Sequence, residues 1–125
     1  MTEQAYTLTH FFNDVVDATY EKVRRRNPSV KKEQVRRNLA LFTANFVVAA
    51  YQRNVHLEYR NLGELIDKCL QGFCAQNNIS AGRDALLIDV PEAEKVLTEN
   101  TKEMPQVQEQ VKYILGGLKN VTIDA

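Results

Sequence analysis

The most conspicuous candidate for chemistry in this sequence is a cluster of basic residues between positions 22 and 37, which we call the basic corner. The cluster holds eight basic residues and one acidic residue, Glu33. Its basic members are Lys22, Arg24, Arg25, Arg26, Lys31, Lys32, Arg36 and Arg37. Such a density of positive charge is suited to a phosphate group or a nucleic acid. The alternative is that these side chains pair with acidic residues in the C-terminal half.

The basic corner conflicts with a local rule of helix electrostatics. Ser29 is expected to cap a helix that begins near Val30, and this start would place Lys31 and Lys32 in the first turn. The helix dipole disfavours cations there by about 0.3 to 1 kcal/mol each. A broken local rule without visible compensation indicates a site selected for function, so the basic corner is the candidate site for an anion, a nucleic acid or another partner.

A second group of polar residues follows one side of the first predicted helix. It consists of His10, Asp14, Asp17 and Glu21, at spacings of four, three and four residues. One histidine and three carboxylates are suitable ligands for a divalent metal. The sequence offers no second histidine or cysteine cluster to complete such a site. We therefore interpret the stripe as a solvated polar face and expect no metal.

The cysteines and the second histidine do not form a recognisable catalytic pattern. Cys69 and Cys74 lie five residues apart in one predicted helix, which separates them by about 140° around its axis and excludes a local disulfide. His56 has no nucleophile near it in the sequence. The P-loop, HExxH, CxxC and dinucleotide-binding motifs are absent. We expect reduced thiols, no catalytic residues and no cofactor.

The length and the charge distribution bound the class of protein. A chain of 125 residues is expected to form a single domain, residues 1–125. Residues 1–60 contain ten basic and six acidic residues, and residues 61–125 contain six and ten, so the halves carry +4 and −4. The N-terminus shows no signal-peptide pattern. We expect a cytoplasmic protein.

The elements that position these residues are organised around residues 39–51, where eleven of thirteen side chains are apolar. The uncharged run of fifteen residues, 38–52, is shorter than the roughly 18 to 20 needed to cross a bilayer. We predict a core helix buried on most sides, with Leu39, Phe42, Phe46 and Ala49 on one face. Asn45 would lie deep in that face and bond within the fold; the alternative is a register-fixing contact across a dimer.

Periodicity and end signals predict the remaining elements. The predicted helices cover residues 9–26, about 30–51, 61–76, about 90–99, and 105 to the glycine pair at 116–117. The last three are predicted to turn an apolar stripe inward, namely Leu62, Leu65, Ile66, Cys69, Leu70 and Phe73, then Ala93, Val96 and Leu97, and finally Met104, Val107, Val111, Ile114, Leu115 and Leu118. Asn61 with Glu64, and Asp89 with Glu92, are predicted to cap the third and fourth helices. Residues 77–82 read as a loop. Residues 53–60 are either a strand or a continued helix, residues 85–90 slightly favour a helix, and residues 120–125 have some strand character.

These observations predict an all-α fold, a bundle of four or five helices around a central apolar helix. A minor two-stranded addition stays open as an alternative. The function we expect is non-enzymatic: an adaptor or regulatory protein that binds a protein partner and forms a homodimer through a helical surface. The alternative is a nucleic-acid-binding regulator that uses the basic corner. We expect no membrane association.

Overall fold

The computed structural model describes residues 6–53, 58–83, 86 and 89–123, with side chains described up to residue 119. Its helices are α1 (Leu8–Arg26), α2 (Lys32–Gln52), α3 (Leu62–Gln76), α4 (Val90–Asn100) and α5 (Pro105–Ile123), and the 3₁₀ turn η1 (Tyr59–Asn61) precedes α3. The described residues contain no strand. The predicted all-α bundle is confirmed. The predicted loop at residues 77–82 is also observed.

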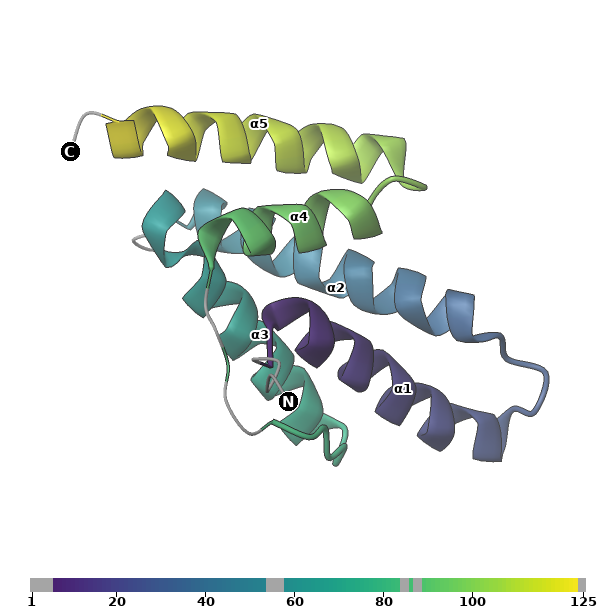
Figure 1. Ribbon diagram of the computed structural model, residues 1–125. Coiled ribbons are helices and arrows are strands. Elements are labelled where there is room, and N and C mark those ends of the chain that lie inside the picture. Colours follow the sequence, from purple (N-terminus) through teal and green to yellow (C-terminus); the bar gives the residue numbers. More distant parts are fainter. Residues whose placement is uncertain (1–5, 54–57, 84–85, 87–88, 124–125) are drawn as a thin grey trace, which may run out of the picture.

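Two helical hairpins and one crossing helix make up the bundle (Figure 1). α1 and α2 form one hairpin, α4 and α5 form the other, and α3 runs across the end of the molecule where α2 finishes. α2 packs against the other four helices, as predicted for the central helix. α4 also packs against all four, although it is only 11 residues long. The bundle therefore has two central helices, and the sequence pointed to one of them.

One hydrophobic core joins side chains from all five helices. The predicted stripe of α4, formed by Ala93, Val96 and Leu97, is buried. In α3 the stripe is buried at Leu62, Ile66, Cys69 and Leu70, and in α5 at Val111, Ile114, Leu115 and Leu118. The amphipathic patterns of these three helices thus indicated correctly which face turns inward.

α2 is oriented differently from the prediction. Its buried positions are Val35, Leu39, Ala40, Thr43, Ala44, Val47 and Ala50. Phe42 and Phe46, which were expected in the core, are 37% and 39% exposed. The small buried side chains let four helices approach α2 closely, whereas the large aromatic residues lie at its periphery. Asn45 is exposed, so its predicted burial is wrong.

The starts of three helices also differ from the prediction. The Ser29 hydroxyl donates to Asn27 Oδ1 at 2.8 Å and does not cap α2, whose N-cap is Lys31. Neither Asn61 nor Asp89 makes a side-chain capping bond. At the start of α4 a tertiary contact engages the predicted partner of Asp89: Glu92 accepts a hydrogen bond from the backbone N–H of Thr9 in α1 at 3.0 Å.

α5 continues through Gly116 and Gly117 to Ile123, so its predicted end near the glycines is wrong. Residues 120–123 are helical rather than strand-like. Leu118 lies beyond the glycines and is 97% buried, with 3% of its surface exposed. Burial of a leucine side chain contributes about 1.5 to 3 kcal/mol, which offsets the roughly 1 kcal/mol that each of the two glycines costs. Of residues 53–60, for which a strand or a continued helix was expected, Tyr59 and Arg60 belong to the 3₁₀ turn η1, and residues 54–57 lie outside the described residues.

Candidate functional site

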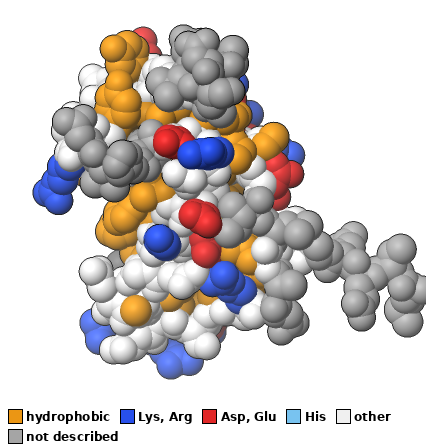
Figure 2. All heavy atoms as spheres, turned by 90° about the vertical axis from the view of Figure 1, so that its left-hand side faces the viewer, with side chains coloured by type: hydrophobic (Ala, Val, Ile, Leu, Met, Phe, Trp, Pro, Cys, Tyr) orange, Lys and Arg blue, Asp and Glu red, His pale blue; other side chains and the backbone are white. Residues whose placement is uncertain are grey.

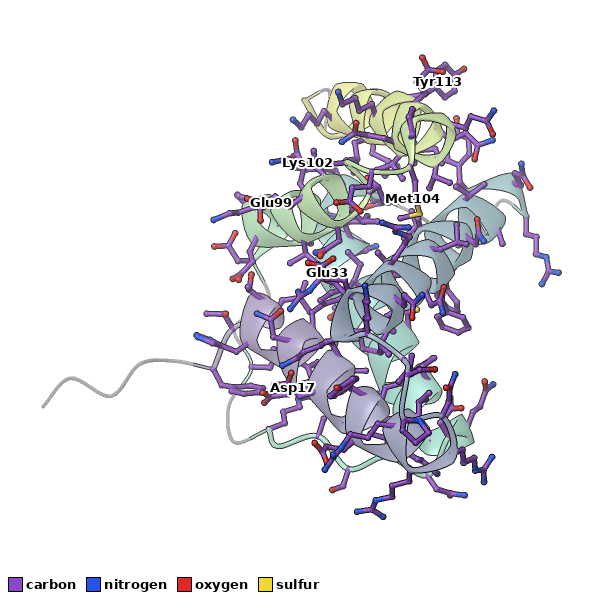
Figure 3. The ribbon with its side chains drawn as sticks, turned by 90° about the vertical axis from the view of Figure 1, so that its right-hand side faces the viewer. Asp17, Glu33, Glu99, Lys102, Met104 and Tyr113 are labelled. Atoms are coloured by element: carbon purple, nitrogen blue, oxygen red, sulfur yellow. The ribbon has the colours of Figure 1, made fainter. Side chains whose placement is uncertain are left out.

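Large hydrophobic side chains are exposed mainly along α2. Among the described residues, five such side chains are exposed, and four of them belong to α2: Leu41, Phe42, Phe46 and Tyr51. The fifth, Tyr113 on α5, points away from the bundle (Figure 3). We call the solvent-facing side of the central helix the outer face of α2. It comprises Asn38, Leu41, Phe42, Asn45, Phe46, Val48, Ala49 and Gln52.

The bundle holds this face in place from behind and from one side. Leu39, Thr43 and Val47 anchor the opposite side of the helix in the core, and the Thr43 hydroxyl donates to Leu39 O at 2.8 Å. On the α3 side, the rings of Phe42 and Phe73 meet edge to face, with centroids 5.2 Å apart. The exposed side chains therefore stand on a rigid element, as a binding surface requires.

The outer face of α2 carries no charged residue. The chain has none between Arg37 and Arg53. Asn45 lies at the middle of the face, is exposed, and forms no side-chain hydrogen bond with any described residue. Val48 and Ala49 beside it are half-buried. Depletion of charge with enrichment of aromatic residues is typical of the core of a protein–protein interface.

Apolar and charged side chains also meet at the end of the molecule where α2 and α5 finish. Figure 2 shows hydrophobic side chains reaching the surface there, next to charged side chains of both signs. The Lys119 ammonium lies 2.7 Å from Glu94 Oε1, and the Tyr59 hydroxyl donates to the same carboxylate. Burial, followed by this bond and the negative charge of Glu94, raises the pKa of Tyr59 to about 12. This contact ties η1 to α4 and α5.

The basic corner lies at the opposite end, where α1 meets α2. Five of its eight side chains have partners, and only one partner is an acid of the C-terminal half. The contacts are Lys22 with Asn77 O, Arg24 with Glu21 at 3.0 Å, Lys32 with Asp17, Arg36 with Asn13 at 2.8 Å, and Arg37 with Glu103 at 2.6 Å. The other three, Arg25, Arg26 and Lys31, are exposed, and their charged side chains form no ion pair with any described residue. The corner is thus partly neutralised, chiefly by neighbours in its own half of the chain.

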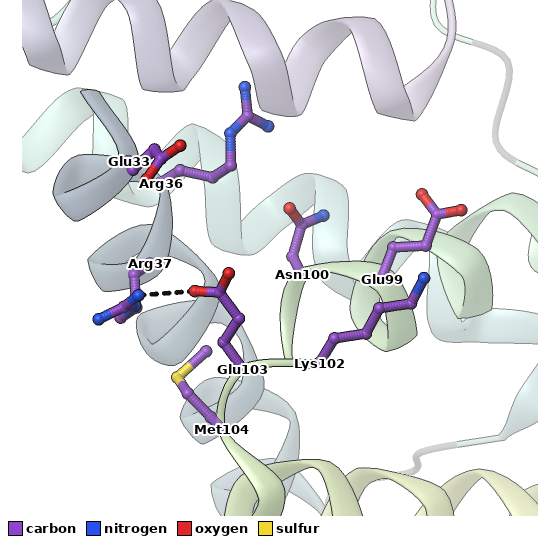
Figure 4. Close-up of a pocket in the computed structure, with 8 residues that line it drawn as sticks. All are labelled: Glu33, Arg36, Arg37, Glu99, Asn100, Lys102, Glu103 and Met104. Carbon is purple, nitrogen blue, oxygen red and sulfur yellow. Dashed lines mark hydrogen bonds and ion pairs between the residues drawn. The ribbon is translucent and has the colours of Figure 1, made fainter. Parts of the chain in front are cut away.

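A cavity of about 260 Å³ lies beside the basic corner, between the start of α2 and the end of α4 (Figure 4). It is lined by Glu33, Arg36, Arg37, Glu99, Asn100, Lys102, Glu103 and Met104. Three acids balance three bases on its walls. Arg37 is already held by Glu103, as the dashed line in Figure 4 shows. The cavity has no net charge and therefore does not select an anion or a cation.

The cysteines do not provide an activated nucleophile. Burial raises the pKa of Cys69 to about 12, against the smaller opposing effect of the nearby Thr43 hydroxyl, and burial also raises the pKa of Cys74. Because the thiolate is the reactive form, both environments disfavour nucleophilic chemistry near neutral pH. His56 lies outside the described residues.

The polar stripe on α1 is used for structural contacts. The Nδ1 atom of His10 lies 2.9 Å from Thr7 Oγ1, and the two residues form the N-terminal cap of α1. Asp17 and Glu21 pair with basic residues of the corner, and Asp14 accepts a hydrogen bond from Tyr6. Within the described part of the chain, no three His, Cys, Asp or Glu side chains are grouped to hold a metal ion.

Sequence reasoning missed one buried polar contact. Asp67 is buried in α3 and accepts hydrogen bonds from Gln71 at 2.7 Å and Arg83 at 3.4 Å. The Arg83 guanidinium also lies 5.6 Å from the centre of the Phe11 ring. Gln71 is four residues from Asp67, a spacing that the sequence could have flagged. The pairing with Arg83 depends on the loop after α3 and has no sequence signal.

Comparison with known proteins does not assign a family. No family model matches the chain, and no significant similarity was found to any curated protein or solved structure. None of the helices in the described ranges is long and apolar enough to cross a membrane.

Proposed function

We propose that this chain is a non-enzymatic adaptor or regulatory protein that binds a protein partner through the outer face of α2. The observation that carries the proposal is the exposure of Leu41, Phe42 and Phe46, each between 36% and 39%, on a face without charge. Burial of such surface by a partner yields about 25 cal/mol per Å² of apolar area. Folding of the single chain leaves this apolar surface exposed, because α2 turns its small residues inward.

The composition of the face and of its ends supports a protein partner. Two aromatic rings and a leucine lie where a partner can cover them, and Arg37 and Arg53 lie at the two ends as a polar rim. Interfaces commonly combine an apolar centre with charged edges that set orientation. Cys69 and Cys74 are both free thiols, which is typical of a reducing compartment and supports a cytoplasmic location.

Site-specific photo-crosslinking tests this proposal. A photoreactive amino acid at Asn45, the centre of the outer face, should yield covalent protein adducts in living cells. The matched control carries the same group at Lys112, an exposed residue of α5. Adducts of any protein at position 45, and none at position 112, are the expected result. Equal labelling at both positions, or none at position 45, would refute binding through this face.

A second candidate function is nucleic-acid binding at the basic corner. It is favoured by Arg25, Arg26 and Lys31, three exposed cations of the corner whose charged side chains form no ion pair with any described residue. It is weakened by the five neighbouring cations that already have partners. A phosphate-binding surface made of the three free cations would be small, so we rank this function below protein binding.

Fluorescence anisotropy of labelled DNA and RNA tests the second function. Binding dominated by about three phosphate contacts should weaken by roughly 40-fold between 50 and 200 mM salt. Replacement of Arg25 and Arg26 by alanine should abolish the binding, whereas replacement of Arg60, which pairs with Glu58 away from the corner, should not. Absence of binding at 50 mM salt would exclude this function.

A further inference from the structure

We infer that the partner of the outer face of α2 is a second copy of this chain, packed antiparallel about a two-fold axis at Asn45. This inference rests on the proposed function and names its partner. Counted from Asn45, the face holds Asn38 at −7, Leu41 at −4 and Phe42 at −3, then Phe46 at +1, Val48 at +3, Ala49 at +4 and Gln52 at +7.

A two-fold axis through Asn45 joins positions of opposite sign. Leu41 then faces Ala49 of the second copy, and Phe42 faces Val48, so that a large, exposed side chain meets a smaller, half-buried one in each pair. Large and small residues at facing positions are what two helices need to interdigitate. A two-fold interface repeats each of these pairs twice. A parallel arrangement would set Phe42 against Phe42 and Ala49 against Ala49.

The same two-fold axis also brings the polar side chains of the face opposite polar side chains of the second copy. Asn45 meets its own copy, and an amide carries both donors and an acceptor, so two amides satisfy each other. Asn38 meets Gln52 of the second copy in the same way. The side chain of Asn45 has no hydrogen-bond partner among the described residues of its own chain. A single polar asparagine in an apolar helix contact is a known device for fixing register.

Electrostatics favour the antiparallel arrangement as well. The uncharged face brings no like charges together at the centre, and antiparallel helix dipoles attract. Arg37 and Arg53 of opposite copies approach each other only at the ends of the contact. The positive charge of Arg37 is already countered by Glu103 of its own chain, 2.6 Å away.

The size of the face sets the expected strength. Fifteen helical residues, 38–52, span about 22 Å, and a single helix face covers less than the roughly 800 Å² that each partner contributes to a standard interface. The flank of α3 at Phe73 adjoins the face through Phe42 and extends it. We therefore expect a reversible dimer with a dissociation constant in the micromolar range rather than an obligate one.

Sedimentation velocity of the full chain from about 5 to 500 μM tests the dimer. The expected result is a monomer–dimer equilibrium that Asn45→Asp weakens at least tenfold, because two carboxylates would meet on the axis. Asn45 is exposed, so this change leaves the fold intact, as circular dichroism can verify. The matched control Gln110→Asp adds the same charge to an exposed position of α5 and should leave the equilibrium unchanged.

Cysteine cross-linking tests the position of the axis. In a Cys74→Ser background, Asn45→Cys should form an intermolecular disulfide on mild oxidation. Leu41→Cys should not, because residues four positions from the axis lie about 12 Å from their own copies, beyond disulfide range. A mixture of Leu41→Cys and Ala49→Cys chains should form the mixed disulfide. These three outcomes together specify an antiparallel contact centred on Asn45.

Contrary results separate the inference from the function on which it rests. A monomer at 500 μM overturns the inference, as does a dimer that tolerates Asn45→Asp and yields no disulfide at position 45. If the chain is monomeric and photo-crosslinks at Asn45 reach a different protein, the proposed function stands and the two-fold contact falls. Absence of any crosslink at Asn45 removes both.

Discussion

At the residue scale, the carboxylate of Asp67 is a buried charge that needs a positive partner. Its side chain is 9% exposed, and Arg83, which is 35% exposed, supplies its positive partner. Oδ1 of Asp67 has no hydrogen-bond partner among the described residues. A buried carboxylate that loses its cation is left poorly compensated. The contact therefore fixes the loop after α3 against the core.

Arg83→Met should destabilise the protein by about 1 to 2 kcal/mol. This value is below that of a fully buried pair, because Arg83 is partly solvated and solvent screens its charge. Urea denaturation monitored by circular dichroism measures the change. The control Arg60→Met breaks an exposed pair with Glu58 and should cost less than about 0.5 kcal/mol. Equal losses in the two variants would contradict the structural role of Asp67.

Glu92 links the start of α1 to α4 and makes the stability depend on pH. Partial burial opposes ionisation of this carboxyl, but hydrogen bonds from the side chain and the backbone of Thr9 outweigh it and lower its pKa below 4.5. A lowered folded-state pKa means that the stabilisation is present above the unfolded-state value. It is lost as the pH falls through the folded-state value.

Glu92→Gln should therefore lower the free energy of unfolding by about 1 kcal/mol at pH 7. This is the approximate difference between a hydrogen bond to a charged carboxylate and one to the neutral amide that replaces it. As the pH falls below 4.5 and through the lowered pKa of Glu92, the stabilities of the two proteins should converge. Denaturation curves at several values of pH between 7 and 3 measure the difference. A difference that does not change with pH would show that the charge of Glu92 has no part in it.

At the scale of elements, α5 shows how tertiary packing overrides local propensity. Gly116 and Gly117 lie within the helix and are exposed, with nothing within 4 Å of an added Cβ atom. Both glycines lose backbone freedom on folding, although no neighbouring atom would obstruct a larger residue at either position. The next residue, Leu118, is buried, and its packing in the core stabilises the helix at this point.

Gly116→Ala and Gly117→Ala should each stabilise the protein by about 0.5 to 1 kcal/mol, because alanine loses less backbone freedom in a helix. Thermal unfolding measures the gain as a higher Tm. Gly82→Ala is the control, since Gly82 is equally unobstructed but lies in the loop after α3. A loss of stability at position 116 or 117 would mean that the chain does not continue as a helix there.

At the scale of the whole molecule, the opposite charges of the two halves form few ion pairs with each other among the residues that the structure describes. Of the six ion pairs among the described residues, one joins residues 1–60 to residues 61–125, namely Arg37 with Glu103. The others are formed within one half. A charge asymmetry of this kind affects which partners a protein attracts and how fast it associates with them, and it does not determine the fold.

Stability should consequently depend little on salt. In four of the six pairs both side chains are at least 36% exposed, and exposed pairs contribute little. Raising sodium chloride from 50 to 500 mM should shift Tm by less than about 3 °C at a low protein concentration where the chain is monomeric. A fall of 10 °C or more would show that these pairs hold the bundle together.

Sequence patterns were sufficient to predict the all-α class, the approximate limits of four of the five helices, and the inward stripes of α3, α4 and α5. These properties follow from periodicities and end signals that act within one helix. Local patterns also drew attention to the right stretch of α2, where apolar residues are most concentrated. They predicted its orientation wrongly, because a helix that is apolar nearly all round has no pattern that distinguishes its sides.

Which side of α2 is covered depends on how the five helices pack together. Four neighbouring helices require close approach, so Ala40, Ala44 and Ala50 turn inward, and Phe42 and Phe46 are left at the surface. The same packing extends α5 beyond its glycines and places Arg83 beside Asp67. It also determines which cations of the basic corner have partners. Each of these outcomes depends on residues distant in the chain, whose competing contacts are settled when the helices pack together.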